Sequence, residues 1–135
     1  MTPKERATKI LAADRFATTS GIVLVDADKD HAVCRMEIAD SHLNAAGGVQ
    51  GGAIFTLADT AFGMAANAEG KLTVSLSNAI SYLKSTSGKA LIATARKVSA
   101  TKRTCVYEVE VTDDLGELIA KMTGTGYIKS ERIAE

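Results

Sequence analysis

The stretch from residue 51 to residue 67 reads Gly51-Gly52-Ala53-Ile54-Phe55-Thr56-Leu57-Ala58-Asp59-Thr60-Ala61-Phe62-Gly63-Met64-Ala65-Ala66-Asn67. It is apolar on nearly every face, which predicts a helix over about residues 51–68 that is buried on all sides. Asp59 is the one ionisable side chain between His42 and Glu69. A buried carboxylate is costly unless it is paired, hydrogen-bonded or catalytic. Asp59 is therefore a candidate catalytic residue. The alternative is a carboxylate that faces solvent or caps a loop.

The segment that precedes this helix, residues 42–52, holds four glycines and a cluster of polar residues. The pair Gly51-Gly52 is expected at the helix N-terminus, where the first N–H groups lack partners and the helix dipole favours negative charge. A thioester or ester carbonyl placed there would have its developing oxyanion stabilised. One helix would then carry an oxyanion site at its tip and a carboxylate about two turns further in. The alternative is a plain glycine turn before a helix.

The composition bounds the class of protein. With 135 residues, of which 46% are hydrophobic, the chain is long enough for one domain with a real core. Sixteen basic and sixteen acidic residues cancel, which argues against nucleic acid or a membrane as the main partner. The charged start, Met1–Arg6, is not typical of a signal peptide. Cys34 and Cys105 form no CxxC motif, which predicts reduced thiols in a cytoplasmic protein without a metal site.

Periodicity predicts a short helix over residues 3–13 and, after it, a series of strands interrupted by the long helix. The expected strands are residues 21–28, 31–38, 72–84, 89–100, 103–113 and 117–128. An α+β domain with a long antiparallel sheet wrapped around one central apolar helix fits this order. Such a sheet would leave an edge, and dimerisation through that edge is expected.

Two motifs carry a resemblance to a known family: Asn44-x-x-Gly47-x-x-Gln50-Gly51-Gly52 and Leu57-Ala58-Asp59-Thr60-Ala61. They resemble the hotdog-fold acyl-CoA thioesterases of the phenylacetate-degradation (PaaI-like) type, over about residues 20–128. The resemblance implies a single hotdog domain over residues 1–135, with residues 1–20 as an N-terminal helix and connector. It also implies a homodimer or homotetramer (a dimer of dimers) that hydrolyses an acyl- or aryl-acyl-CoA without a cofactor, since coenzyme A is part of the substrate.

The resemblance also implies roles for individual residues. Asp59 would act as general base or nucleophile, and the Gly51 N–H would stabilise the oxyanion. Asn44 would line the same pocket. Ser75, contributed by the facing subunit, would orient water, with Ser77 on the same strand face as the second choice. The active site would then lie at the subunit interface.

Two positions depart from the family pattern. Gln50 stands where the family usually has histidine, and an amide side chain hydrogen-bonds but does not titrate near neutral pH. Gln50 is therefore expected to hold the carbonyl region of the substrate. Lys84 stands where relatives often have arginine, and no proline follows it.

The remaining expected substrate contacts are apolar side chains and basic residues. The acyl group is expected against apolar side chains of the loop and helix, such as Val49, Phe55 and Phe62, with Leu76 or Tyr82 from the strand. Gly52 is a further expected substrate contact. Between residues 71 and 103 the chain has seven basic residues and no acid: Lys71, Lys84, Lys89, Arg96, Lys97, Lys102 and Arg103. Such a block suits the phosphates of coenzyme A, with Lys84 as the best single candidate. The alternative is a solvated strand surface.

Two other functions fit the same sequence. One is a non-catalytic acyl-CoA or lipid-binding hotdog module, in which Gln50 marks lost chemistry. The other is a structural protein that uses the long helix only as core, which predicts no affinity for coenzyme A. A thioester hydrolysis assay separates both from an enzyme.

Overall fold

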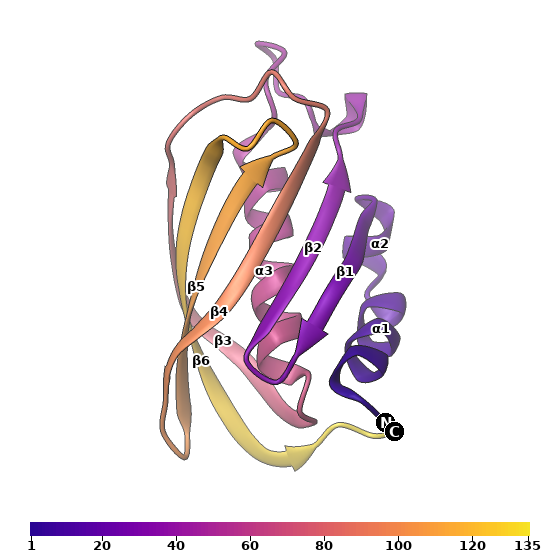
Figure 1. Cartoon of the computed structure of the whole chain (residues 1–135), viewed down its shortest axis with the longest axis vertical. Coiled ribbons are helices and arrows are strands. Elements are labelled where there is room, and N and C mark those ends of the chain that lie inside the picture. Colours follow the sequence, from indigo (N-terminus) through magenta and orange to yellow (C-terminus); the bar gives the residue numbers. More distant parts are fainter.

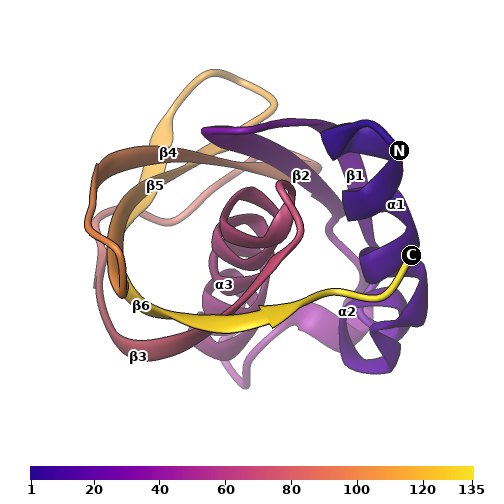
Figure 2. The same cartoon turned by 90° about the horizontal axis from the view of Figure 1, so that it is seen from below.

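A computed structural model describes all residues from 1 to 135, and its sheet curls around one central helix, α3 (Figure 1 and Figure 2). The order of elements is α1 (Pro3–Ala13), α2 (Arg15–Thr19), β1 (Ile22–Asp28), β2 (His31–Glu37), a 3₁₀ turn η1 (Asp40–His42), α3 (Gly51–Asn67), β3 (Lys71–Tyr82), β4 (Ala90–Ala100), β5 (Thr104–Asp113) and β6 (Leu118–Arg132). The predicted α+β architecture is confirmed. No helix is long and apolar enough to cross a membrane.

All neighbouring strands are antiparallel, in the order β1-β2-β4-β5-β6-β3. Alternate residues of the strands point at α3 and form the core with it, as in β2, where Ala32, Cys34 and Met36 are fully buried. The helices α1 and α2 pack beside β1 (Figure 2). Strand β3 is the other edge of the sheet.

The helix α3 is not buried on all sides, which corrects the expectation from its composition. Among its partly or fully exposed residues, four are spaced by three or four positions, and they are Gly52, Thr56, Asp59 and Gly63. This spacing puts them on one face of the helix, here called the open stripe. The sheet covers the other faces, and the only carboxylate of the helix lies on the stripe that it leaves open.

A β-bulge in β3 changes which of its side chains face α3. Ser75 pairs with Gly126, whereas Ser77 pairs with Thr125, so two steps along β3 match one step along β6. Gly124 and Gly126 face the helix, because a Cβ on either would lie 3.2 Å from the Phe62 ring. Residues directly opposite one another share a face of the sheet. Ser75 and Asn78 therefore face α3, and Ser77 faces away.

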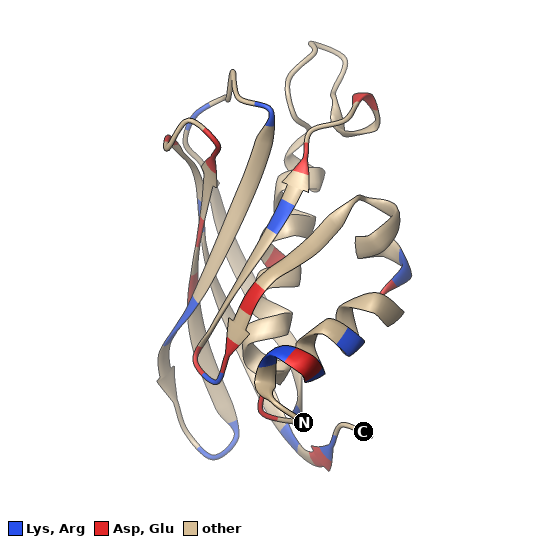
Figure 3. Ribbon diagram, turned by 45° about the vertical axis from the view of Figure 1, so that its right-hand side comes forward, with Lys and Arg blue, Asp and Glu red and all other residues tan.

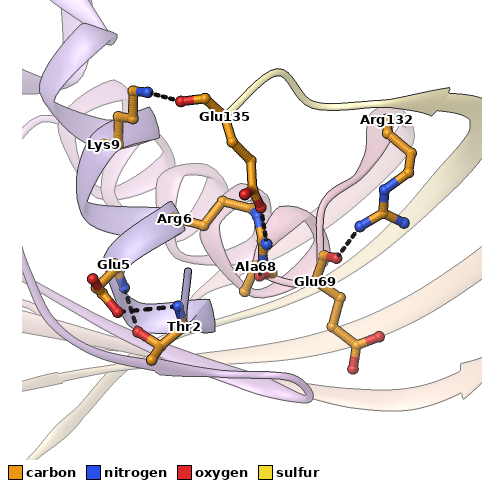
Figure 4. A network of polar contacts seen from close by, with 8 residues as sticks. All are labelled: Thr2, Glu5, Arg6, Lys9, Ala68, Glu69, Arg132 and Glu135. Carbon is orange, nitrogen blue, oxygen red and sulfur yellow. Dashed lines mark hydrogen bonds and ion pairs between the residues drawn. The ribbon is translucent and has the colours of Figure 1, made fainter.

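The C-terminal end of α3 is closed by two arginines from distant parts of the chain (Figure 4). Arg6 of α1 is buried and donates from Nη1 to the Ala68 carbonyl at 2.6 Å, and it also pairs with Glu135. Arg132 at the end of β6 donates to the Glu69 carbonyl at 3.1 Å. Cations at a helix C-terminus complement the negative end of the helix dipole. This end of α3 is therefore satisfied within the fold.

The predicted helices and strands agree with the structure except at three places. The short helix α2 was not expected; it is five residues long and follows its N-cap Asp14, whose side chain accepts from the Ala17 N–H. The turn η1 was also missed, and β6 runs four residues further than predicted. Cys34 and Cys105 are buried free thiols. Burial raises the pKa of Cys34 to about 12, so this thiol is an inert core residue.

Candidate active site

The N-terminal tip of α3 carries one free N–H donor. Gln50 is the N-cap, and its side-chain Oε1 accepts from the Gly52 N–H. Its backbone carbonyl accepts from the N–H groups of Ala53 and Ile54. Of the four N–H groups that a helix start leaves without intrahelical partners, only that of Gly51 then has no acceptor. Gln50 caps the helix through Oε1, which leaves its amide nitrogen without a partner, and its expected role at the substrate carbonyl stays a prediction.

Asp59 lies on the open stripe and is half-buried. The Ser75 hydroxyl approaches its carboxylate, with Oγ at 3.5 Å from Oδ1. Partial burial raises the pKa of Asp59, the hydrogen bond from Ser75 opposes this rise, and the negative charge of Asp14 adds to it. Burial is the largest of the three effects, so the carboxyl group is a stronger base than an exposed aspartate.

Ser75 reaches Asp59 within a single chain, whereas the family resemblance implied a serine from a facing subunit. The reason is the tight turn at Gly70, whose φ of +97° lets β3 run back along α3. Asp59 lies eight residues before the end of the helix, about 12 Å at the helical rise. Ser75 lies four residues after the start of β3, about 13 Å at the strand rise. The two side chains are thus level with each other.

A pocket of about 510 Å³ opens at the tip of α3. Its walls come from the loop before the helix, the first turn of the helix and the segment after β3. The lining residues are Asn44, Gly48, Val49, Gly51, Ile54, Tyr82, Leu83, Lys84, Ser85, Thr86 and Ile119. The Tyr82 hydroxyl donates to the Gly51 carbonyl at 3.1 Å, and a Cβ at position 51 would lie 3.2 Å from Tyr82 Cζ. A glycine at the tip therefore lets Tyr82 close over it.

The loop that forms one wall of the pocket is held by two polar side chains. Asn44 Oδ1 accepts from the N–H groups of Ala46 and Gly48, at 2.9 and 3.1 Å. Its amide nitrogen remains available to a ligand in the pocket. The buried His42 ring uses both nitrogens on the backbone, with Nδ1 accepting from Ala39 at 3.0 Å and Nε2 at 2.7 Å from the Ser20 carbonyl. His42 is an anchor for the loop and not a catalytic group.

The opposite wall is fixed by Asp113, a buried carboxylate at the end of β5. It accepts from the Thr86 hydroxyl at 2.6 Å and from the N–H groups of Leu115 and Glu117. The hydrogen bond from Thr86 is the main reason that the pKa of Asp113 is lowered. These bonds join the β5–β6 turn to the segment after β3 and so set the width of the pocket.

Several predicted substrate contacts lie elsewhere. Phe62 is a core residue, packed with its ring centroid 5.5 Å from that of Tyr107 and 2% exposed. Phe55 and Gly52 lie on α3 outside the pocket lining, and Ser77 faces away from the helix because of the bulge. Lys84 lines the pocket, but its ammonium is paired with Glu117 at 2.8 Å. The predicted residues that do line this pocket are Asn44, Val49, Gly51, Tyr82 and Lys84.

Sequence reasoning missed other residues of this region. Ile54 and Ile119 supply apolar surface to the pocket, and Asn78 donates to Ser75 Oγ at 3.3 Å. Ile54 lies three residues after Gly51, and residues three apart are neighbours on a helix surface, so the sequence could have predicted Ile54 beside the tip. Asn78 had no such signal, because strict alternation along β3 puts it on the wrong face. No group of three or more His, Cys, Asp or Glu side chains is placed to hold a metal ion.

A second hollow, of about 310 Å³, lies at the opposite end of the molecule beside the β4–β5 turn, where Figure 3 shows basic segments. Its lining includes four cations and no acid: Lys71, Lys102, Arg103 and Lys129. None of the four makes an ion pair. Unpaired like charges around one hollow create a local positive potential. We call this site the basic hollow.

Comparison with known proteins places this architecture in a family. Residues 46–120 match the model of the Thioesterase superfamily. The chain is 34% identical to the acyl-coenzyme A thioesterase PaaI of Escherichia coli over 121 residues, which are 89% of this chain and 84% of that protein.

Two solved structures share the fold. The structure of the E. coli PaaI protein superposes with a TM-score of 0.91 at 29% identity, covering 96% of this chain and 95% of that one. A thioesterase from Streptococcus pneumoniae, solved with coenzyme A, superposes with a TM-score of 0.84 at 27% identity, covering 94% and 99%. The chain therefore belongs to the thioesterase superfamily and is a PaaI-like hotdog-fold thioester hydrolase.

Proposed function

We propose that the substrate is an acyl- or aryl-acyl-CoA and that Asp59 and the Gly51 N–H carry out the hydrolysis. The observation that carries this proposal is the pairing, on one helix, of a single free N–H donor with a half-buried carboxylate on the open stripe. The E. coli relative is an acyl-coenzyme A thioesterase, and the S. pneumoniae neighbour was solved with coenzyme A. Both support coenzyme A as the thiol component of the substrate.

The spacing of the two groups suits one thioester carbonyl. Their Cα atoms are eight residues apart, about 12 Å along the helix. The Asp59 side chain leans toward the N-terminus, which shortens this gap. A carbonyl whose oxygen accepts from an N–H at ~2.9 Å and whose carbon is approached by water at ~3.2 Å spans about 7 Å with its contacts, and the hydrogen bond of ~2.8 Å from this water to the carboxylate extends the span to about 10 Å. Such a substrate would lie along the open stripe with its oxygen at the tip.

In the reaction, the Asp59 carboxylate takes a proton from water while the water oxygen bonds to the carbonyl carbon. The Gly51 N–H stabilises the oxyanion that forms. Collapse breaks the carbon–sulfur bond, and the thiolate of coenzyme A takes the proton from Asp59. If the carboxylate instead attacks directly, water then opens the anhydride. In a single turnover in ¹⁸O-water, the general-base route puts one ¹⁸O into the product acid, whereas an anhydride opened at the Asp59 carbon gives an acid without ¹⁸O, so an unlabelled product identifies direct attack.

The phosphates of coenzyme A are proposed to bind in the basic hollow. Lys71 of this hollow precedes Ser75 by four residues on β3, about 13 Å. The extended pantetheine arm of coenzyme A is about as long as four extended residues, ~14 Å. Phosphate groups are strong ligands for Lys and Arg. Lys84 is a weaker candidate than the sequence indicated, because Glu117 already neutralises it.

A second copy of the chain is the proposed partner, in a dimer or a dimer of dimers with the active site at the subunit interface. The edge of β3 has no neighbouring strand, and two apolar side chains on this strand, Val74 and Leu76, are 39% and 58% exposed. An exposed apolar edge strand is a site of strand pairing. Light scattering of the purified chain measures the assembly. The cytoplasmic location and the absence of a cofactor stay predictions.

The test of the proposed function is the substitution Asp59→Asn. Turnover of a small panel of acyl-CoA substrates, followed by free-thiol detection, should fall by about 10²-fold or more, because the base is lost and the shape is kept. Asp28→Asn, at an exposed end of β1, is the matched control and should keep full activity. Near-normal turnover in folded Asp59→Asn would refute the role of Asp59, and an absence of turnover by the wild-type chain would favour a binding module.

The same assay gives the sign of the pH dependence. The active form is the carboxylate, and its pKa is raised. Wild-type turnover should therefore be lost as the pH falls through a value above the ordinary aspartate range of about 3.9.

A further inference from the structure

We propose that Asn78 is a positioning residue, which holds the Ser75 hydroxyl with its proton directed at Asp59. This inference rests on the proposed function of Asp59 as base or nucleophile. The three side chains form a chain of contacts, from Asn78 Nδ2 to Ser75 Oγ at 3.3 Å and from Ser75 Oγ to Asp59 Oδ1 at 3.5 Å. Nothing in the family motif points to Asn78, because it faces the site only through the bulge in β3.

The direction of the contacts follows from the chemistry of the groups. An amide nitrogen only donates, and an ionised carboxylate only accepts. Ser75 Oγ accepts from Asn78 and so turns its own proton to Asp59. Without Asn78, the Ser75 hydroxyl is free to rotate and donate elsewhere.

The oxygen of the Asn78 amide is expected to lower the stability of the fold. Its Oδ1 is buried and has no hydrogen-bond partner. It lies against the backbone of β6, where a Cβ at Gly124 would come within 2.8 Å of it. An unsatisfied buried acceptor destabilises a fold. An apolar side chain at position 78, which lies on the inner face of β3 between Thr73 and Ile80, would avoid this loss of stability. The donor half of the amide, which contacts Ser75, gives a reason for an asparagine here.

The experiment is a double-mutant cycle on Asn78 and Ser75, with Ser81→Ala as control. Ser81 lies on the outer face of the same strand, opposite the exposed Lys121. Asn78→Ala should lower kcat about fivefold, the effect of one ordinary hydrogen bond, with KM within about twofold. Ser75→Ala should do the same, and the double variant should be no slower than the slower single variant.

The pH profile separates positioning from a structural role. The charged group that faces Asp59 from the neighbouring helices is Asp14, which all these variants retain. Loss of the Ser75 bond should move the acidic limb of kcat to higher pH in Asn78→Ala and in Ser75→Ala alike. Asn78→Asp should move it further, because its carboxylate accepts the Ser75 proton and adds negative charge.

Two results would overturn the proposal. One is a loss of kcat in the double variant that equals the product of the losses in the two single variants. The other is an acidic limb of the kcat–pH profile that does not move in Asn78→Ala. If Asn78→Ala does not fold, Asn78→Leu, which has the same branching of heavy atoms and removes the donor without adding charge, decides by the same limb. The proposed function fails separately, since only an active Asp59→Asn or an inactive wild-type chain would refute it.

Discussion

The two ends of α3 are treated in opposite ways. At the C-terminal end, Arg6 and Arg132 come from remote elements to occupy the carbonyls of Ala68 and Glu69. At the N-terminal end, Gln50 covers one N–H and the Gly51 N–H stays free beside the pocket. At the C-terminal end, the protein itself supplies hydrogen-bond donors to the backbone carbonyls. At the end that faces the pocket, one backbone N–H is left for a ligand. This difference is an argument, independent of any relative, for the N-terminal end as the site proposed above.

The sharpest way to break this comparison is Gly51→Pro, which removes the free N–H and little else. Proline is well tolerated at the first helical position, and Gln50 already has the extended conformation that precedes a proline, with φ −64° and ψ 135°. Turnover should fall by about 10²- to 10³-fold, the cost of losing one oxyanion donor. The measurement is kcat for one acyl-CoA.

Its control is Gly51→Ala, which keeps the N–H and adds a Cβ 3.2 Å from the Tyr82 ring. If the alanine variant is as slow as the proline variant, crowding by Tyr82 explains the loss and the donor has no role.

The next effect concerns the far end of the molecule, where the basic hollow lies. Lys102→Ala/Arg103→Ala should raise KM for acyl-CoA about tenfold and weaken its salt dependence, with kcat unchanged, because phosphate contacts serve binding. Hydrolysis of the corresponding acyl-pantetheine, which lacks the nucleotide, should not change. The charge-matched control Lys4→Ala/Arg15→Ala removes exposed cations from α1 and α2. An equal rise of KM in the control would show that the overall electrostatic potential of the protein attracts the substrate and that the basic hollow is not a specific phosphate site.

The closed end of α3 should govern stability and not catalysis. Arg6→Met keeps an apolar stem but leaves the Ala68 carbonyl without its donor. We expect the free energy of unfolding to fall by ~1–3 kcal/mol, the cost of an unsatisfied buried acceptor. Urea denaturation measures this, and kcat of the folded variant should match wild type. A loss of kcat with stability intact would mean that this end also shapes the site.

The smallest effect is expected at the cap of the open end. Gln50→Ala should lower the free energy of unfolding by about 0.5–1 kcal/mol, as for other N-cap losses. Its pH profile should keep the single acidic limb of Asp59, since an amide does not titrate. A neutral limb that is present in wild type and absent in this variant would reveal an ionising group controlled by Gln50.

Much of this molecule follows from residue patterns. The apolar run with one acid predicted α3, the Gly pair predicted its tip, and alternation in β2 predicted its buried face, all of which the structure confirms. The thioesterase assignment, made by resemblance, is confirmed by the family match.

What patterns missed depends on tertiary geometry. The placing of Phe62 in the core follows from Gly124 and Gly126, which let β6 approach the helix closely and which lie 62 and 64 residues further along the chain. The pairing of Lys84 with Glu117 joins segments that no local period relates. The role of Gln50 as a cap needed the helix start to be known to the residue.

The bulge in β3 changes which alternate residues of this strand face the helix. Before it, odd-numbered residues such as Ser75 face the helix; after it, even-numbered ones such as Asn78 and Tyr82 do. Deleting Leu76 would remove the bulge and leave every later side chain of β3 opposite its present partner on β6. Strict alternation with Leu76 retained would instead turn Asn78 and Tyr82 away from the helix. Relatives are better aligned at this strand by the glycines of β6 opposite it than by counting residues along β3.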